Sequence, residues 1–365
     1  MVFIKDITDY LESIAPLSLQ EKYDNAGLII GDSETPVQKI LVCLDVTEKI
    51  IEEAVENNIN LIISHHPIVF SPLKKLTGKT FVERIIQKSI KHDIALYAIH
   101  TNLDNVYHNG VNEEICNVLG IFNKRILVPK RGVLMQLTAF VPTDYAQKVL
   151  NALYDVGAGQ IGVYKNCSFR TSGIGTFTPV DSAQPFIGEK NVRTEVEEER
   201  IEVIFPEYLE RKIMSALRNA HPYEEVAYYL HTLANANQEV GSGMIGEIEP
   251  ADAMLFLKKV KTVMQAGVVR YTAITEKKIV KVAVCGGAGR FLLNDAISQG
   301  ADIFITSDFK YHDFFEANGK IIVADIGHFE SEQFTIQLLQ KLLKKKFEDI
   351  FVLSASFSTN PVNFL

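Results

Sequence analysis

The chain has 365 residues, of which 47% are hydrophobic and 22% are charged. These values are typical of a globular protein and exclude a disordered or fibrous one, and the length favours two or three domains. The formal net charge of −8 argues against binding to nucleic acid, because phosphate contacts need a surplus of Lys and Arg.

The first sixteen residues predict an amphipathic helix rather than a targeting signal, because apolar residues recur at helical spacing between acidic ones. No stretch approaches the roughly eighteen uninterrupted apolar residues that a membrane span requires. We therefore expect a cytoplasmic protein without a membrane partner. Four cysteines, Cys43, Cys116, Cys167 and Cys285, show no CxxC pairing and indicate reduced, buried thiols.

Short apolar runs alternate with helical patterns in both end segments. Such runs are typical of strands buried on both faces, as in a parallel sheet between helices. The predicted strands are 40–44, 59–63, 94–99, 282–284, 303–305, 321–324 and 350–353, and the predicted helices are 47–57, 81–92, 290–298 and 329–346. The expected fold class is therefore α/β, with a mixed or parallel sheet flanked by helices.

The middle of the chain has a different element order, β-α-β-β-α-β, which is the ferredoxin-like arrangement. The predicted strands are 135–140, 168–177, 200–205 and 226–231, and the predicted helices are 144–156 and 206–219. The similar segments 140–142 and 204–206 suggest two βαβ halves, and the polar stretch 181–200 fits a solvated excursion between them.

The simplest architecture is one α/β domain that is interrupted by an inserted α+β domain. The first would contain residues 1–126 and 247–365, and the insertion residues 127–246.

Histidines and carboxylates collect where the predicted strands of the end segments finish. In open α/β sheets, ligands bind beyond the carboxyl ends of the strands. Imidazole and carboxylate are the ligands that catalytic divalent metals take, and an i,i+4 pair at a helix start projects from one face. The predicted metal ligands are His65, His66, Asp104, His328 and Glu332.

Five ligands exceed what one zinc ion with an open position needs, so they indicate two ions about 3.5 to 4 Å apart. Asp104 or Glu332 would supply a bridge between them. Zinc is the first choice, and iron and manganese accept the same ligands. His100 and His312 are candidates for proton transfer or for support of the ligands, with a structural role as the alternative.

Two further motifs leave their roles open. The loop 286–289 follows a strand. Its backbone amides either bind an anion, or the loop simply makes a tight turn. His221 lies beside two carboxylates in the middle segment, but no partner ligand is evident nearby, so a structural or interfacial role is favoured.

At these residues the chain resembles the Nif-three-like family, whose members are often labelled GTP cyclohydrolase I type 2 homologues. The motifs that carry the resemblance are 23–28, 64–67, 98–104, 308–313 and 327–332. The resemblance implies a dinuclear metal site on the five predicted ligands and a ring-shaped homohexamer. It also implies an inserted domain similar to the PII and CutA proteins.

Two functions follow as hypotheses. The first is a metal-dependent hydrolase acting on a nucleotide, with GTP suggested by the family label alone and a nucleotide phosphoesterase using the same metals. His100 or His312 would then move a proton. The second is a non-catalytic hexameric metal-binding scaffold or regulatory protein. A transcriptional co-factor finds little support in an acidic chain without a DNA-binding motif.

Overall fold

The computed structural model describes residues 1–274 and 278–365, and the chain divides into two compact units. We call Met1–Pro129 with Glu239–Leu365 the split unit, and Lys130–Gln238 the inserted unit. The chain leaves the split unit along β5 (Phe122–Arg131) and returns along β10 (Ala236–Ala251).

One sheet of the split unit has five strands in the order β1-β4-β3-β2-β15. Its members are β1 (Gly27–Ile30), β2 (Lys39–Cys43), β3 (Leu61–Ser64), β4 (Ala95–Ala98) and β15 (Phe351–Ser354). All are parallel except β1. Because Val352 pairs with Ile40, the two ends of the sequence share this sheet.

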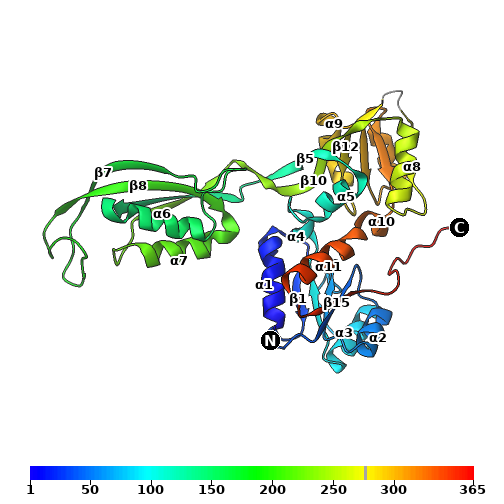
Figure 1. Ribbon diagram of the computed structural model, residues 1–365, viewed down its shortest axis with the longest axis horizontal. Helices are drawn as coiled ribbons and strands as arrows, with labels where there is room; N and C mark the ends of the chain where they lie inside the picture. Colours follow the sequence, from blue (N-terminus) through cyan, green and yellow to red (C-terminus); the bar gives the residue numbers. More distant parts are fainter. Residues whose placement is uncertain (275–277) are drawn as a thin grey trace. The chain divides into compact units, whose positions relative to one another are not determined.

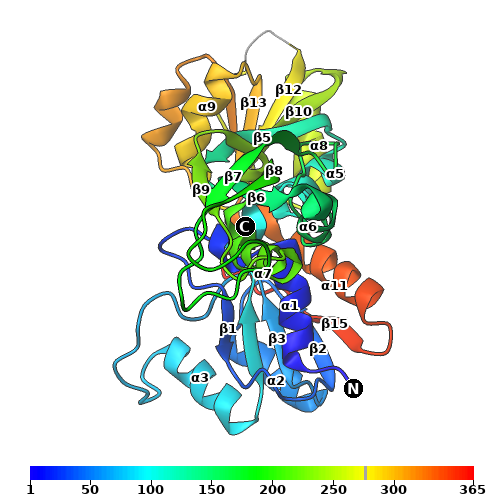
Figure 2. The ribbon, with the colours of Figure 1, turned by 90° about the vertical axis from the view of Figure 1, so that its left-hand side faces the viewer.

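Helices cover both faces of the five-stranded sheet (Figure 2). Buried residues of α2 (Glu48–Glu56) and α3 (Phe81–Lys91) pack on one face, and those of α1 (Ile4–Ile14) and α11 (Phe334–Lys346) pack on the other. The starts of α2 and α3 are set by threonines, since Thr47 and Thr80 each accept a hydrogen bond from a backbone amide three residues later.

The second sheet of the split unit has six strands in the order β11-β14-β13-β12-β10-β5. Its further members are β11 (Arg270–Tyr271), β12 (Ile279–Val284), β13 (Ile303–Thr306) and β14 (Ile322–Asp325). The central strands β12, β13 and β14 are parallel. Apolar residues of α9 (Leu293–Ser298) pack on one face, and those of α5 (Val111–Leu119) and α8 (Ala253–Val263) pack on the other.

The α/β class is confirmed, but the strands of the two end segments form two sheets rather than one. The parallel strands form two sheets, because β15 pairs with β2 while β12 to β14 pair among themselves and with β10. An apolar run shows that a segment is a buried strand, but it does not show which strand is its neighbour. Within the described residues, every helix is too short or too polar to cross a lipid bilayer.

The inserted unit has the predicted order β-α-β-β-α-β. The elements are β6 (Leu134–Pro142), α6 (Ala146–Asp155), β7 (Phe169–Phe177), β8 (Thr194–Pro206), α7 (Glu210–Ala220) and β9 (Tyr228–Leu233). The strands form an antiparallel sheet in the order β7-β8-β6-β9. The two helices pack on one face of it (Figure 1). The likeness of this unit to PII and CutA proteins stays a prediction.

One detail of the inserted unit differs from expectation. The polar stretch 181–200 is not a solvated excursion throughout. Its residues Glu195, Glu197, Glu198 and Glu199 belong to β8 and pair with β7, and the last two also pair with β6. Strand pairing outweighs their low strand propensity, and most of their side chains point to solvent, although Glu198 is buried.

Candidate metal centre

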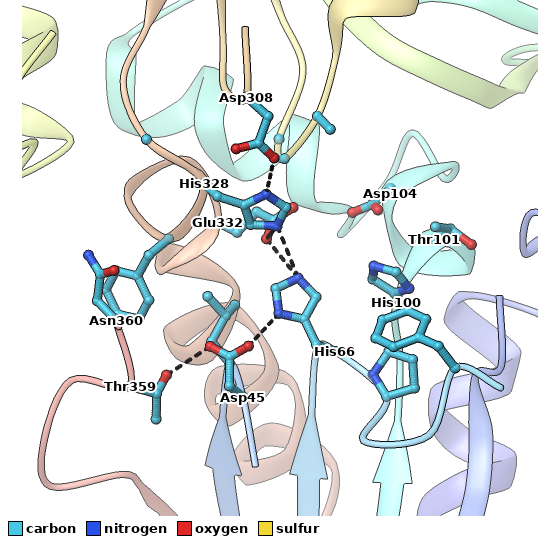
Figure 3. Close-up of a pocket in the computed structure, with 18 of the residues that line it drawn as sticks. Asp45, His66, His100, Thr101, Asp104, Asp308, His328, Glu332, Thr359 and Asn360 are labelled. Atoms are coloured by element: carbon cyan, nitrogen blue, oxygen red, sulfur yellow. Dashed lines mark hydrogen bonds and ion pairs between the residues drawn. The ribbon is translucent and has the colours of Figure 1, made fainter. Parts of the chain in front are cut away.

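A cavity of about 1470 Å³ opens in the split unit where strands of both sheets end (Figure 3). Its wall includes His66 and His100, which follow β3 and β4 of the five-stranded sheet. It also includes His328 and Glu332, which follow β14 of the six-stranded sheet. The carboxyl ends of parallel strands in two sheets therefore supply one pocket.

The backbone fixes the two adjacent histidines of the sequence SHHP. The amides of His65 and His66 donate to the carbonyls of Cys43 and Leu44, at 3.2 and 3.0 Å. The hydroxyl of Ser64 donates to the carbonyl of His66 at 2.7 Å. Neighbouring residues at a strand end point in different directions, so His65 is fully buried while His66 reaches the cavity.

His328 and Glu332 are placed by a short helix, α10 (His328–Glu332). Gly327 caps the start of the helix, and its φ of +96° is a conformation that favours glycine. The i,i+4 spacing brings the Nε2 atom of His328 to 3.1 Å from a carboxylate oxygen of Glu332.

Two imidazoles face each other across the pocket. The Nδ1 atoms of His66 and His328 lie 2.8 and 2.6 Å from the carboxylates of Asp45 and Asp308 (Figure 3). A carboxylate accepts a hydrogen bond, so each Nδ1 carries a proton and each Nε2 of a neutral ring presents a lone pair. These two Nε2 atoms are 3.3 Å apart, and they lie 3.0 and 3.1 Å from the same oxygen of Glu332.

This arrangement is repulsive unless a cation or extra protons lie between the three groups. In the protein without metal, protons fill that role. Burial would lower the pKa of both histidines, but Asp45 and Glu332 raise the pKa of His66 to about 9, and Asp308 and Glu332 raise the pKa of His328 to about 11. A divalent ion would replace these protons, so the donor set fits a metal.

A second group of donors surrounds His65. Its Nδ1 atom lies 2.8 Å from the carbonyl oxygen of Ile99, which only accepts, so this nitrogen carries the proton. The Nε2 atom is buried without a hydrogen-bond partner, and it lies 3.6 Å from Asp104 Oδ1 and 3.8 Å from Glu332 Oε1. That oxygen of Asp104 also has no hydrogen-bond partner. An unpaired buried polar atom costs about 1 to 3 kcal/mol, which a bound cation would remove.

The surroundings shift the pKa values of Asp104 and Glu332 in opposite directions. Burial raises the pKa of Asp104 well above its usual range, and the charge of Glu332 raises it further. Burial opposes ionisation of Glu332 as well, but contacts with His328, His65 and His66 hold its pKa well below its usual range. Glu332 is therefore the negative centre on which both groups of imidazoles converge.

His100 lies beside these donor groups. Its ring centre is 5.3 Å from that of His65 and 5.2 Å from that of His66, and its Nδ1 atom lies 2.8 Å from Asp24. His312, in contrast, is exposed and packs against Tyr311 and Phe315. It is not among the described residues that line the cavity. The structure thus brings together six of the seven predicted site residues and leaves out His312.

The sequence alone does not assign a role to the three carboxylates that accept hydrogen bonds from the imidazoles. Asp24, Asp45 and Asp308 each bind the Nδ1 atom of one histidine at the site. Asp45 and Asp308 do follow predicted strands, which is a usable signal. The sequence does not show which histidine each one meets, because each pair is joined only through the fold.

The two motifs that the sequence left open have structural roles. In the loop after β12, the amides of Gly286, Gly287 and Gly289 all donate to side chains of the protein, which favours the tight turn over an anion site. The ring of His221 accepts from the amide of Tyr223 and donates to the carbonyl of Phe140, so both nitrogens are used.

Comparison with known proteins agrees with the motifs at the site. The family model described as Duf34/NIF3 (NGG1p interacting factor 3) matches residues 2–361. The chain belongs to the Duf34/NIF3 family. The resemblance drawn from the sequence is therefore confirmed.

Relatives in this family match along nearly the whole chain. The GTP cyclohydrolase 1 type 2 homolog of Halalkalibacterium halodurans is 39% identical, with 98% of each chain covered. That of Bacillus subtilis is 37% identical, over 99% of this chain and 98% of the relative. The crystal structure of a Bacillus cereus protein related to NIF3 superposes with a TM-score of 0.87 at 36% identity, covering 100% of this chain and 99% of the other.

Proposed function

We propose that the pocket binds two divalent metal ions through His65, His66, Asp104, His328 and Glu332, and that the protein is a metal-dependent hydrolase acting on a nucleotide. The observation that carries the metal centre is the orientation of three imidazoles. Each is bonded at Nδ1, and each directs an Nε2 atom at Glu332. Zinc is the first choice of ion, with iron and manganese as alternatives.

Glu332 is the better candidate for the bridge between the ions. Its Oε1 atom faces His65, and its Oε2 atom faces His66 and His328. One carboxylate thus meets both groups of ligands with separate oxygens. Asp104 would complete the group around His65, where its Oδ1 atom needs a partner.

The chemistry divides between the ions and the protein. Bound divalent ions supply Lewis acidity, which acidifies water and polarises a bond of the substrate. His100 lines the cavity beside the ligands, and Asp24 holds its Nδ1 atom. We assign proton transfer to its Nε2 atom. Proton transfer by His312 stays a prediction. No contact supports it, because this side chain is not among the described residues that line the cavity.

The nucleotide is proposed from the relatives, which are named GTP cyclohydrolase 1 type 2 homologs. The aromatic side chains Tyr23, Phe70, Phe291 and Phe329 line the cavity and offer surfaces on which a purine ring can stack.

A second candidate function, a non-catalytic hexameric scaffold that stores or delivers metal, is favoured by the charge of the pocket. Among the described residues, seven carboxylates and one arginine, Arg270, line the cavity. That arginine is paired with Asp325. Such a wall attracts cations and repels a triphosphate.

One experiment separates these functions. Metal content is measured on purified wild-type protein, His66→Ala and the control His92→Ala, which replaces an exposed histidine. Each protein is then incubated with GTP and a panel of nucleotides. We expect two ions per chain and turnover in the wild type and the control, and loss of both metal and turnover in His66→Ala.

The other outcomes are equally informative. Two ions per chain without turnover of any nucleotide would favour the scaffold. A wild-type protein that binds no divalent ion would contradict both functions. Light scattering tests the hexamer, for which we expect about six times the chain mass of 40.9 kDa.

A further inference from the structure

The last residues of the chain cross the pocket between the two sheets. We call residues 355–365 the C-terminal strap. At its start, the amide of Ala355 donates to the carbonyl of Val42 in β2, at 2.9 Å. At its end, the ring of Phe364 packs on Gly267, where an added methyl group would lie 2.1 Å from the ring. Gly267 precedes β11, so the strap is attached to both sheets and forms part of the cavity wall.

Thr359 in the strap reaches a ligand of the proposed metal centre through one carboxylate. Its hydroxyl donates to Asp45 Oδ2 at 3.0 Å, and Asp45 Oδ1 accepts from His66 Nδ1 at 2.8 Å (Figure 3). Both oxygens of Asp45 are thus engaged, one by the strap and one by the histidine. A carboxylate that binds one nitrogen of an imidazole fixes the orientation of the ring, and so the direction of the second nitrogen. By holding Asp45, Thr359 therefore helps to orient the Nε2 atom of His66.

Asn360, the next residue, makes the equivalent contact on the opposite wall. Its side-chain amide donates to Glu330 Oε1 at 3.0 Å. Glu330 is buried within α10, two residues from both His328 and Glu332, and its other oxygen packs on Gly327. Consecutive residues of the strap therefore hold carboxylates that come from the two sheets.

We infer that the C-terminal strap is a positioning element of the metal centre, in which Thr359 orients His66 through Asp45 and Asn360 fixes the start of α10. The inference rests on the proposed metal centre. It predicts a selective effect on the cation held by His66, His328 and Glu332. The ligands on the other side are fixed differently, because His65 is held by the carbonyl of Ile99 and Asp104 lies on α4 (Thr101–Asp104).

The test compares Zn²⁺ binding to the full-length protein and its variants by competition with a chromophoric chelator. Thr359→Val removes the hydroxyl and keeps the shape, whereas Thr359→Ser keeps the hydroxyl. Thr262→Val is the matched control, because it removes the hydroxyl of an exposed threonine that donates to the backbone carbonyl of Lys258 within α8, in the same unit. For Thr359→Val we expect one of the two binding steps to weaken by about tenfold, the lower end of the range for residues behind a ligand.

The remaining variants make the result specific. We expect Thr359→Ser and Thr262→Val to bind both ions as the wild type does. Deletion of residues 356–365 should weaken the same binding step more than Thr359→Val. With Co²⁺ as the probe, the visible absorption of one ion should change in Thr359→Val and return in Thr359→Ser, which a general loss of stability would not produce.

Two results would overturn the inference. The first is unchanged affinity for both ions in Thr359→Val and in the deletion, and the second is equal weakening of both steps in Thr359→Val, which would indicate general loosening. Neither result would contradict the proposed metal centre, since the wild type would still bind two ions. If the wild type binds none, the proposed function fails first, and the inference falls with it.

Discussion

Asp24 shows how one carboxylate can link stability to pH at this site. Burial would raise its pKa, but hydrogen bonds from His100 and Thr101 outweigh burial and lower the pKa to about 2. The folded state therefore favours the charged form. The resulting stabilisation is complete above the unfolded pKa near 4, and it is lost as the pH falls from about 4 to about 2.

We expect Asp24→Asn to lower the free energy of unfolding of the metal-free protein by about 1 to 2 kcal/mol at pH 7, after allowance for solvent screening. The difference from the wild type should shrink at pH 3. Urea unfolding at both pH values measures it, with the exposed Asp155→Asn as the control. A difference that is the same at both pH values would show that the lost contact is not one of charge.

The cysteines differ in exposure, which corrects the expectation of four buried thiols. Cys43, Cys116 and Cys285 are buried, and burial raises the pKa of each thiol. Cys167 is only partly buried, because it lies in the irregular segment between α6 and β7 of the inserted unit.

We therefore expect iodoacetamide to label one cysteine of the native protein rapidly and the other three only after unfolding, because the thiolate is the reactive form. Mass spectrometry counts the labels, and Cys167→Ser should remove the rapid one. Rapid labelling of a second cysteine in the native protein would contradict the burial of that thiol.

At the scale of elements, the turn after β12 controls how closely the chain approaches Glu332. Gly287 has a φ of +62°, and a methyl group added there would lie 2.4 Å from Glu332 Oε1. Gly319 has a similar φ of +66°, but no atom lies within 4 Å of an added methyl group. Substitution of either glycine by alanine would therefore strain the backbone, but only the substitution at Gly287 would also create a contact with Glu332.

We expect Gly287→Ala and Gly319→Ala each to lose about 1 kcal/mol or somewhat more of stability, because alanine is strained at positive φ. Only Gly287→Ala should also weaken metal binding, by about tenfold or more, since it displaces the proposed ligand Glu332. Chelator competition and urea unfolding measure the two effects. Equal metal affinity in the two variants would remove Glu332 from the ligand set.

The helices and buried strands that carry the site could be predicted because their patterns are local. An almost continuous apolar run such as 59–63 and the i,i+4 pair of His328 and Glu332 need no knowledge of distant neighbours. In contrast, β10 was missed because its sixteen residues include glycines and charged side chains rather than an apolar run. The carboxylate partners of the histidines and the division into two sheets depend on long-range pairing, which a local pattern does not encode.

At the scale of the whole molecule, all of the proposed ligands lie in the split unit. Its strands β5 and β10 are neighbours at the point where the chain leaves and returns, and an added methyl group at Gly241 would lie 2.2 Å from the carbonyl of Val128. A short turn can therefore join Pro129 to Glu239. This arrangement also supports the predicted insertion of one domain into another.

We expect a chain in which residues 130–238 are replaced by a short glycine-rich turn to fold and to bind two divalent ions with affinities within about twofold of the full protein, because no proposed ligand is removed. Circular dichroism and the chelator assay measure both properties. A shortened chain that folds but binds no metal would show that the inserted unit takes part in the centre.

The pairing of β15 with β2 also determines when the protein can mature during synthesis. The ribosome makes β2 early, yet one edge of this apolar strand has no partner until β15 has been translated. His65, His66 and Asp104 likewise emerge long before His328 and Glu332. A nascent chain therefore carries only part of the proposed ligand set beside an open strand edge, and that set is complete only after Glu332 has been translated.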